Sequence, residues 1–436
     1  MENRLLARAA RLCAGNAAVR ALGFGMRIWL ARAVDEQALG IFEMSAQLSM
    51  LLLSPLVSGL PQAASRMAAQ RMSRGDAAGA ECAGRAARMM AGLGAGALTL
   101  VCLPLTPLLA RMMGDARMAL PFVAALPAAV PLALCAVYYG CMYARGSTLP
   151  ASLQLTEQSV RLVCALVLIG VLGGAGPVQD ATLLTAAQTA GAIVALALTR
   201  GAAEPPVEPV CARRCDMRAL WRSAWPISLG RMSTSGLRSV NQMLLPGRLA
   251  LAGLSGAAAM REYGVLSGMA LPTVFLPFMF TGPLATLALP RMAGARSQRE
   301  AVHLARRSLA LAGAAGGAAW ALMAGLGPVV GSRVFGSARA GEMIRMLAAL
   351  APLGCLVQTL GALLQGMGRE RAAMRSTLAG ALCSTALTWT LAAQPALGIR
   401  GFALALSAGQ ALTLAAHGAL LVRGLRSFAG AGGSAG

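Results

Sequence analysis

The chain has 436 residues, of which 57% are hydrophobic and only 12% are charged, and its mean hydropathy is +0.64. A soluble chain of this length would carry about twice that share of charged residues. Apolar stretches long enough to cross a bilayer recur along the whole sequence. This composition excludes a soluble enzyme and predicts an all-α polytopic membrane protein.

The formal net charge is +22, and every basic residue is an arginine. The arginines crowd alternate loops between the apolar stretches, whereas the intervening loops, such as Val34–Gly40, are short and poor in arginine. Arginine-rich loops remain on the cytoplasmic side of a membrane. We therefore predict that both termini are cytoplasmic and that the basic charge reflects topology. No nucleic-acid partner is expected.

Twelve transmembrane helices are predicted in chain order. Their approximate ranges are 12–33, 41–64, 89–110, 118–142, 150–173, 181–199, 221–246, 263–288, 308–330, 342–366, 373–394 and 400–422. The break at Arg200–Leu220 contains two consecutive prolines and mixed charge, which is typical of a linker. The sequence thus predicts an N-terminal six-helix lobe (1–199), a cytoplasmic linker (200–220), a C-terminal six-helix lobe (221–424) and a flexible glycine-rich tail (425–436).

The first span of each half carries two arginines seven residues apart. Arg20 and Arg27 in the first half correspond to Arg231 and Arg238 in the second, at the same offset of 211 positions. Seven residues are close to two turns of an α-helix, so each pair would lie on one helix face. An even number of spans per half makes the repeat parallel, and a substrate site is then expected between the two lobes.

Family resemblance is carried by stretches along most of the chain. They are LGFGMRIWLARAVDEQALGIFE (22–43), GLPQAASRMAAQ (59–70), LPASLQLTEQSVRLV (149–163), MLLPGRL (243–249) and YGVLSGMALPTVFLP (263–277). They resemble the stage V sporulation protein B branch of the polysaccharide flippases. This branch belongs to the multidrug/oligosaccharidyl-lipid/polysaccharide (MOP) superfamily, which also holds the multidrug and toxic compound extrusion (MATE) transporters.

The resemblance implies a MATE-like fold of two six-helix lobes. It also implies a transporter that flips an undecaprenyl-diphosphate-linked oligosaccharide, such as a peptidoglycan precursor, by alternating access. The membrane would be the bacterial cytoplasmic membrane, and the process would be spore cortex or envelope polysaccharide synthesis.

Arginines within the spans are the main candidates for a substrate site. An unpaired guanidinium in hydrocarbon is costly and usually faces a bundle interior or a wet cavity. Its planar fork of donors suits phosphate oxygens. We predict that Arg20, Arg27, Arg231 and Arg238 hold the diphosphate, the alternative being that they extend to the membrane interface. Arg66, at the cytoplasmic end of span two, is either a gate or headgroup clamp or a positive-inside anchor.

Glu157 and Arg161 lie one helical turn apart in span five, in the favourable order for an ion pair. One interpretation is a structural pair that makes both charges tolerable in the bundle. The other is that Glu157, alone or with Glu43, senses protons or cations during transport. Few other carboxylates lie at membrane depth, so these two are the main candidates for ion coupling.

No catalytic triad, phosphate-binding loop or metal-ligand spacing is recognisable, and the ten cysteines are scattered. We predict that the protein is not an enzyme and has no catalytic residue, metal or cofactor. The rival functions are a cation- or proton-coupled small-molecule antiporter of the MATE type on the same fold and a non-transporting membrane scaffold. An arginine-rich, carboxylate-poor interior favours the flippase. Its expected partners are the lipid-linked substrate, membrane lipids and a coupling proton or sodium ion, and we expect a monomer.

Overall fold

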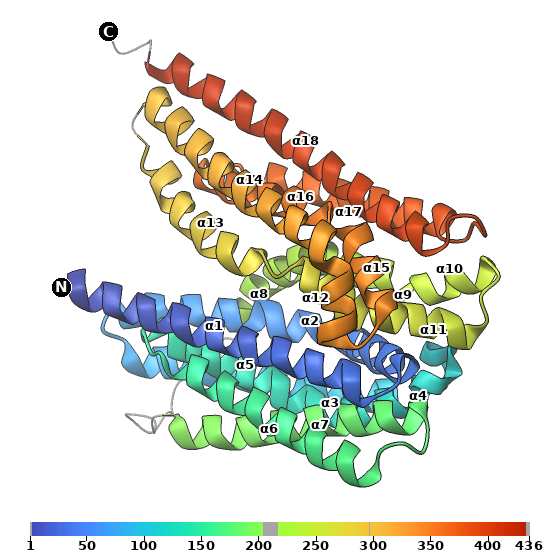
Figure 1. Cartoon of the computed structure of the whole chain (residues 1–436). Helices are drawn as coiled ribbons and strands as arrows, with labels where there is room; N and C mark the ends of the chain where they lie inside the picture. Colours follow the sequence, from blue (N-terminus) through green and yellow to red (C-terminus); the bar gives the residue numbers. More distant parts are fainter. Residues whose placement is uncertain (1, 204–216, 296, 433–436) are drawn as a thin grey trace. The chain divides into compact units, whose positions relative to one another are not determined.

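A computed structural model of the chain describes residues 2–203, 217–295 and 297–432, and these residues form helices without any strand (Figure 1). The predicted all-α class is therefore confirmed. The helices are α1 (Glu2–Ala33), α2 (Glu36–Met72), α3 (Ala77–Met112), η1 (Ala116–Met118), α4 (Ala119–Ala125), η2 (Leu126–Ala128), α5 (Ala129–Ala144), α6 (Leu149–Leu172), α7 (Pro177–Ala202), α8 (Met217–Arg231), η4 (Met232–Gly236), α9 (Leu237–Met243), α10 (Leu245–Leu251), α11 (Gly256–Gly264), η5 (Val265–Ala270), α12 (Leu271–Val274), α13 (Phe278–Ala293), α14 (Gln298–Val329), η6 (Val330–Phe335), α15 (Ala338–Leu347), α16 (Leu350–Gly366), α17 (Glu370–Leu391) and α18 (Ile399–Gly432). The short η1 and η2 are 3-10 helices, whereas η4, η5 and η6 are π-helices.

Each predicted span largely coincides with one helix or a run of consecutive helical segments, although 373–394 extends beyond the end of α17 at Leu391. Among the described residues, seven helical stretches are long and apolar enough to cross a membrane, and α15 with α16 makes an eighth that is bent by 48°. A polytopic helical membrane protein is thus confirmed. The count of twelve spans is consistent with the helices but stays a prediction, because several C-terminal segments are short or carry more polar residues.

The chain forms two compact units, and the first extends as far as Ser239. Its central helix is α2, which packs against α3, α5, α7 and α8, while α6 packs against α7 and α1 (Figure 1). The contacts of α2 with α3 and α5 are lined largely by alanine, including Ala63, Ala64, Ala87, Ala91 and Ala133. Small side chains let helix backbones approach closely, which is how helices associate in a membrane.

Helix α2 stays continuous although Pro55 and Pro61 lie inside it. A proline removes the hydrogen bond to the carbonyl four residues earlier. For Pro55 that carbonyl belongs to Leu51, and the Ser54 hydroxyl donates to it at 2.8 Å. The Ser228 hydroxyl of α8 donates to the Pro55 carbonyl oxygen, also at 2.8 Å. The Ser54 hydroxyl thus supplies a hydrogen bond to the carbonyl that Pro55 leaves without its helical partner, and the Ser228 hydroxyl links α8 to α2.

The second compact unit begins at Val240. Its central helix is α16, which packs against α13, α14 and α18, and α17 packs along α18. Glycine again permits the closest contact, since a Cβ added at Gly316 of α14 would lie 2.6 Å from Pro352 Cα of α16. The π-helices η5 and η6 both belong to this unit.

The boundary between the compact units falls at Ser239, after the predicted linker, because α8 packs against α2. Most of that linker, residues 204–216, lies outside the described residues. Helix α18 continues to Gly432 and includes much of the segment whose composition predicts a tail. The predicted division into two six-helix lobes, a linker and a tail stays a prediction.

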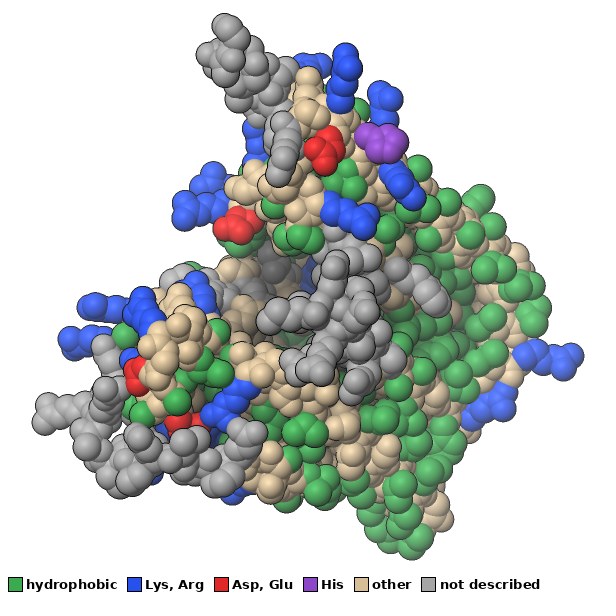
Figure 2. All heavy atoms as spheres, turned by 90° about the vertical axis from the view of Figure 1, so that its left-hand side faces the viewer, with side chains coloured by type: hydrophobic (Ala, Val, Ile, Leu, Met, Phe, Trp, Pro, Cys, Tyr) green, Lys and Arg blue, Asp and Glu red, His purple; other side chains and the backbone are tan. Residues whose placement is uncertain are grey.

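The surface is apolar over broad areas, and arginine side chains crowd only part of it (Figure 2). Large apolar side chains are exposed along the sides of the helices, for example Leu100 at 74% and Val171 at 75%. Trp221 and Trp225 of α8 are also exposed, and their rings lie 5.4 Å apart. An exposed apolar surface with tryptophan beside arginine is typical of a protein whose outer surface contacts lipid.

The contact between α2 and α8 generates a stability prediction. A Cβ added at Gly59 would overlap the Ser228 hydroxyl and lie 2.6 Å from the Ala224 carbonyl oxygen. We expect Gly59→Val to lower the unfolding free energy in detergent by about 1–3 kcal/mol, as overpacking does. The measurement is thermal unfolding of the purified protein.

Gly96→Val is the matched control, because a Cβ at Gly96 of α3 meets nothing within 4 Å. A Gly59→Val protein as stable as the Gly96→Val protein would show that α8 does not pack on α2 as described.

Candidate functional site

Among the described site residues, a salt bridge joins α1 to α2. Arg27 Nη1 donates to Glu43 Oε1 at 2.7 Å. The Glu43 side chain is 11% exposed and that of Arg27 is 36% exposed, so the pair is partly buried. The Glu43 carboxylate therefore has its counter-charge in the first helix.

The short connection between α1 and α2 explains why these two residues meet. Helix α1 ends at Ala33 and α2 begins at Glu36, where the Asp35 side chain caps the new helix by accepting from the Gln37 backbone N–H at 3.1 Å. Arg27 lies six residues before the end of α1, and Glu43 lies seven residues after the start of α2. At 1.5 Å per residue both are about 10 Å from the connection, so they reach the same depth.

Helix α6 adds two further charges. Arg161 interacts electrostatically with Arg27, Glu43 and Glu157. Its Nε atom is buried and has no hydrogen-bond partner in the described part of the chain. Glu157 and Arg161 lie on α6 one turn apart, but within the described part of the chain the salt bridge that forms between predicted site residues is that of Arg27 with Glu43.

These four residues, Arg27, Glu43, Glu157 and Arg161, are called the four-charge cluster below. All of them belong to the first compact unit, and they come from α1, α2 and α6. Gly191 of α7 lets α6 approach, since a Cβ there would lie 3.1 Å from Arg161 Cβ and 3.2 Å from the Glu157 carbonyl oxygen. The cluster contains two cations and two anions, so it is formally neutral.

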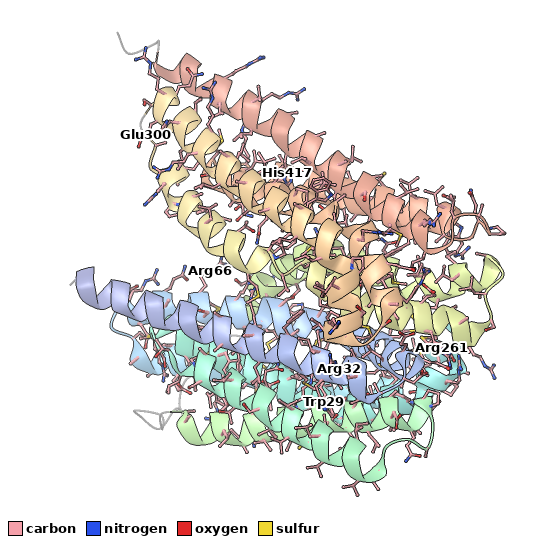
Figure 3. All side chains as sticks on the ribbon, in the orientation of Figure 1. Trp29, Arg32, Arg66, Arg261, Glu300 and His417 are labelled. Carbon is pink, nitrogen blue, oxygen red and sulfur yellow. The ribbon has the colours of Figure 1, made fainter. Side chains whose placement is uncertain are left out.

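Arg20 and Arg66 lie apart from this cluster. Arg20 is exposed on α1, two turns before Arg27. Arg66 is exposed near the end of α2, where its Nη2 donates to the Ser223 hydroxyl of α8 at 2.9 Å. Twenty-three residues of α2 separate Arg66 from Glu43, which is roughly 35 Å along a helix. Figure 3 shows Arg66 and Arg32 toward opposite ends of these helices. A single diphosphate in contact with Arg27, the partner of Glu43, therefore cannot also contact Arg66.

The second arginine pair, unlike the first, does not lie on one continuous α-helix. Arg231 is the last residue of α8, and its side chain is outside the described part of the structure. Arg238 is exposed in α9, and the π-helix η4 separates the two. A π-helix has more residues per turn than an α-helix. The seven-residue spacing therefore places Arg20 and Arg27 on one face of α1 but does not do the same for Arg231 and Arg238.

The sequence analysis missed buried polar side chains that interact electrostatically with Glu157. Cys135 and Tyr139 of α5 are buried, and the Cys135 thiol lies 4.0 Å from the Thr199 hydroxyl of α7. Glu157 interacts electrostatically with both Cys135 and Tyr139. Cys135 and Tyr139 lie one turn apart in an otherwise apolar helix, and this spacing of two polar residues could have indicated them from the sequence. Glu157 is thus linked electrostatically to buried polar groups of α5.

A small pocket, partly open to the outside, lies among α2, α3, α4, η2, α5 and α7. Its lining is largely apolar, and its polar members are neutral: Ser49, Thr185, Gln188 and Thr189. The Gln188 side-chain oxygen is buried without a hydrogen-bond partner among the described residues. Nothing in the hydrophobic pattern of the separate helices predicts this pocket, because several helices form it together.

Comparison with known proteins agrees with this fold. A family model described as polysaccharide biosynthesis protein matches residues 5–295. The chain is 26% identical over 430 residues to stage V sporulation protein B of Bacillus subtilis (strain 168), covering 94% of this chain and 82% of that protein.

Solved structures of similar fold are transporters. A multidrug resistance MATE family transporter of the MOP superfamily, in an inward-facing conformation, has a TM-score of 0.80 at 16% identity and covers 96% of both chains. A MOP superfamily transporter from Pyrococcus furiosus Vc1 (DSM3638), for which a reverse polarity of the binding pocket suggests a different function, has a TM-score of 0.62 at 17% identity and covers 96% of this chain and 94% of that one. The predicted MATE-like fold is confirmed, and because the family model covers more than half of the sequence, the chain belongs to the polysaccharide biosynthesis protein family.

Proposed function

We propose that the protein is a membrane transporter that flips an undecaprenyl-diphosphate-linked oligosaccharide, such as a peptidoglycan precursor, across the bacterial cytoplasmic membrane by alternating access. Membership of the polysaccharide biosynthesis protein family and the similarity to a stage V sporulation protein B support this proposal. They also make spore cortex or envelope polysaccharide synthesis the proposed process. The protein acts as a carrier and not as an enzyme.

The observation that carries the proposal is the exposure of arginine on α1. Arg27 is 36% exposed while it is held by Glu43, and Arg20 is exposed on the same face about 10 Å away. A diphosphate carries at least two negative charges, and a guanidinium offers it two parallel donors. Two arginines on one helix face therefore make a better site for a diphosphate than for a cationic drug.

The remaining arginines keep their predicted roles as part of this proposal. Arg231 and Arg238 contribute from the second half of the chain. Arg66 is too far along α2 to share one diphosphate with Arg27, so it acts where the headgroup first meets the protein at the cytoplasmic end. Glu43 and Glu157 are the carboxylates that would couple transport to a proton or sodium ion.

The alternative is a cation- or proton-coupled drug antiporter, which the MATE-like fold also accommodates. The sign of the charge that the site offers distinguishes the two functions. A cationic drug needs an unpaired carboxylate, whereas a diphosphate needs an available guanidinium. Expression in a strain depleted of its lipid II flippase distinguishes them. Restored growth supports the flippase, whereas resistance to cationic drugs without restored growth supports the antiporter.

Flipping should depend on the arginines that are proposed to hold the diphosphate and not on arginine in general. We expect Arg27→Ala and Arg231→Ala to abolish flipping of lipid II in proteoliposomes while the folded protein is retained. Arg27→Lys should restore only part of the rate, because a point charge keeps the attraction but loses the bidentate geometry. Equal flipping by the Arg27→Ala, Arg231→Ala and parent proteins would contradict the proposal.

The proposed orientation, with both termini and the Arg200–Leu220 linker in the cytoplasm, can be tested at two exposed turns of the first compact unit. Ser73 follows α2, and Ala175 lies between α6 and α7. In a cysteine-free background, Ala175→Cys should react with a membrane-impermeant maleimide in intact cells, and Ser73→Cys should react only after lysis. Labelling of Ser73→Cys in intact cells would reverse the orientation.

A further inference from the structure

Helix α8 has one buried face and one exposed face. Leu220, Ala224 and Ser228 are buried, and the Ser228 hydroxyl donates to the Pro55 carbonyl oxygen of α2 at 2.8 Å. These contacts fix which side chains α8 presents outward. The exposed face carries a row of large apolar side chains, one per helical turn and each 43–50% exposed: Met217, Trp221, Trp225 and Leu229.

Two arginines lie beside this apolar row. Arg218 and Arg222 are exposed, and each directly follows a member of the row in the sequence. At about 100° per residue, both lie within about 60° of Trp225 around the helix axis. The rings of Trp221 and Trp225 are 5.4 Å apart and tilted by 30°. An aromatic surface of two rings therefore borders two guanidinium groups.

The charge of these two arginines is not neutralised within the described part of the chain. Helix α8 contains no Asp or Glu. The salt bridges among the described residues involve other arginines. Helix α3 also contacts α8, but its carboxylate, Glu81, is already bound by Arg88 and Arg145 at 2.7 Å each. The exposed face of α8 is therefore positively charged.

The exposed face changes from basic to apolar along α8. Its basic part lies at the end of α2 that Arg66 marks, because the Ser223 hydroxyl accepts from Arg66 Nη2 at 2.9 Å (Figure 3). Its apolar part lies further along α2, where Ser228 contacts Pro55. Leu229 is seven residues beyond Arg222, or about 10 Å along the helix. This length is comparable with the depth of the headgroup region of a bilayer.

We propose that this face of α8 binds an anionic phospholipid, such as phosphatidylglycerol. Arg218 and Arg222 hold its phosphate, because the planar fork of a guanidinium suits phosphate oxygens. The acyl chains cover Trp225 and Leu229. The net positive charge of the face favours an anionic headgroup over a zwitterionic one. This site does not depend on which substrate the protein carries, so it goes beyond the proposed function.

The test is quenching of tryptophan fluorescence in the purified full chain by phospholipids with brominated acyl chains, added in zwitterionic detergent. The reporter protein keeps Trp221 and Trp225 and has phenylalanine at the other three of its five tryptophan positions. We expect brominated phosphatidylglycerol to reach half-maximal quenching at a concentration about thirtyfold lower than brominated phosphatidylcholine, because two arginines attract the anionic headgroup. Arg218→Gln/Arg222→Gln should abolish this preference, and Arg218→Lys/Arg222→Lys should retain part of it.

Arg371 and Arg375 of α17 provide the matched control, because they are also exposed and four residues apart. Arg371→Gln/Arg375→Gln should leave the preference for phosphatidylglycerol unchanged. A second reporter keeps only Trp320 of α14, which is 49% exposed and has no arginine within twelve positions along the chain. The two brominated lipids should quench this reporter equally, since its surroundings on the helix are apolar.

Equal quenching of the first reporter by both lipids would overturn the proposal, since α8 would then be an ordinary lipid-facing surface. A preference that survives Arg218→Gln/Arg222→Gln would also overturn it. Competition decides between a phospholipid and the transported lipid: unlabelled phosphatidylglycerol should displace the brominated lipid, and displacement by undecaprenyl diphosphate alone would contradict the assignment. Thermal unfolding identifies any misfolded variant, and the lysine variant, which keeps both charges, then decides. Flipping by Arg27→Ala is measured separately, so the two proposals fail independently.

Discussion

A charge in the apolar interior of a membrane is stable only beside an opposite charge or water, and the first compact unit is organised around this constraint. Its main ion pair, Arg27 with Glu43, links α1 to α2 at the depth that the short connection sets for both helices. Glu157 and Arg161 extend the cluster onto α6. The result is a neutral group of four charges in which one arginine remains partly exposed and another has an unused buried donor.

The same constraint governs the backbone. Within a membrane every N–H and C=O needs a partner inside the protein. Around Pro55 the hydroxyls of Ser54 and Ser228 hydrogen-bond to backbone carbonyls, and α2 continues without a break. In the region of spans seven and eight the chain is divided into short α-helices separated by π-helices. Proline content alone does not distinguish a continuous helix from a divided one, because hydrogen bonds from neighbouring side chains also contribute.

Family and fold contribute different parts of the functional conclusion. The family model and the stage V sporulation protein B relative relate the chain to polysaccharide synthesis. The solved structures of similar fold are below 20% identity and relate it only to the architecture of MATE transporters. The charged cluster supports the proposed phosphate-bearing substrate, because arginine suits phosphate and each carboxylate of the cluster interacts with an arginine.

The sequence by itself determined the helical class, the membrane environment, the helical segments and the family, because apolar length, arginine distribution and ordered motifs are local properties of the chain. It also indicated Arg27, Glu43, Glu157 and Arg161 as important, since charges in apolar helices stand out. It could not show that Arg27 pairs with Glu43, that Arg66 lies roughly 35 Å along α2 from that pair, or that a π-helix interrupts the second arginine pair. The sequence also could not show the pocket near Gln188. These features depend on which helices pack together and on local changes of helical pitch, and only the tertiary structure decides both.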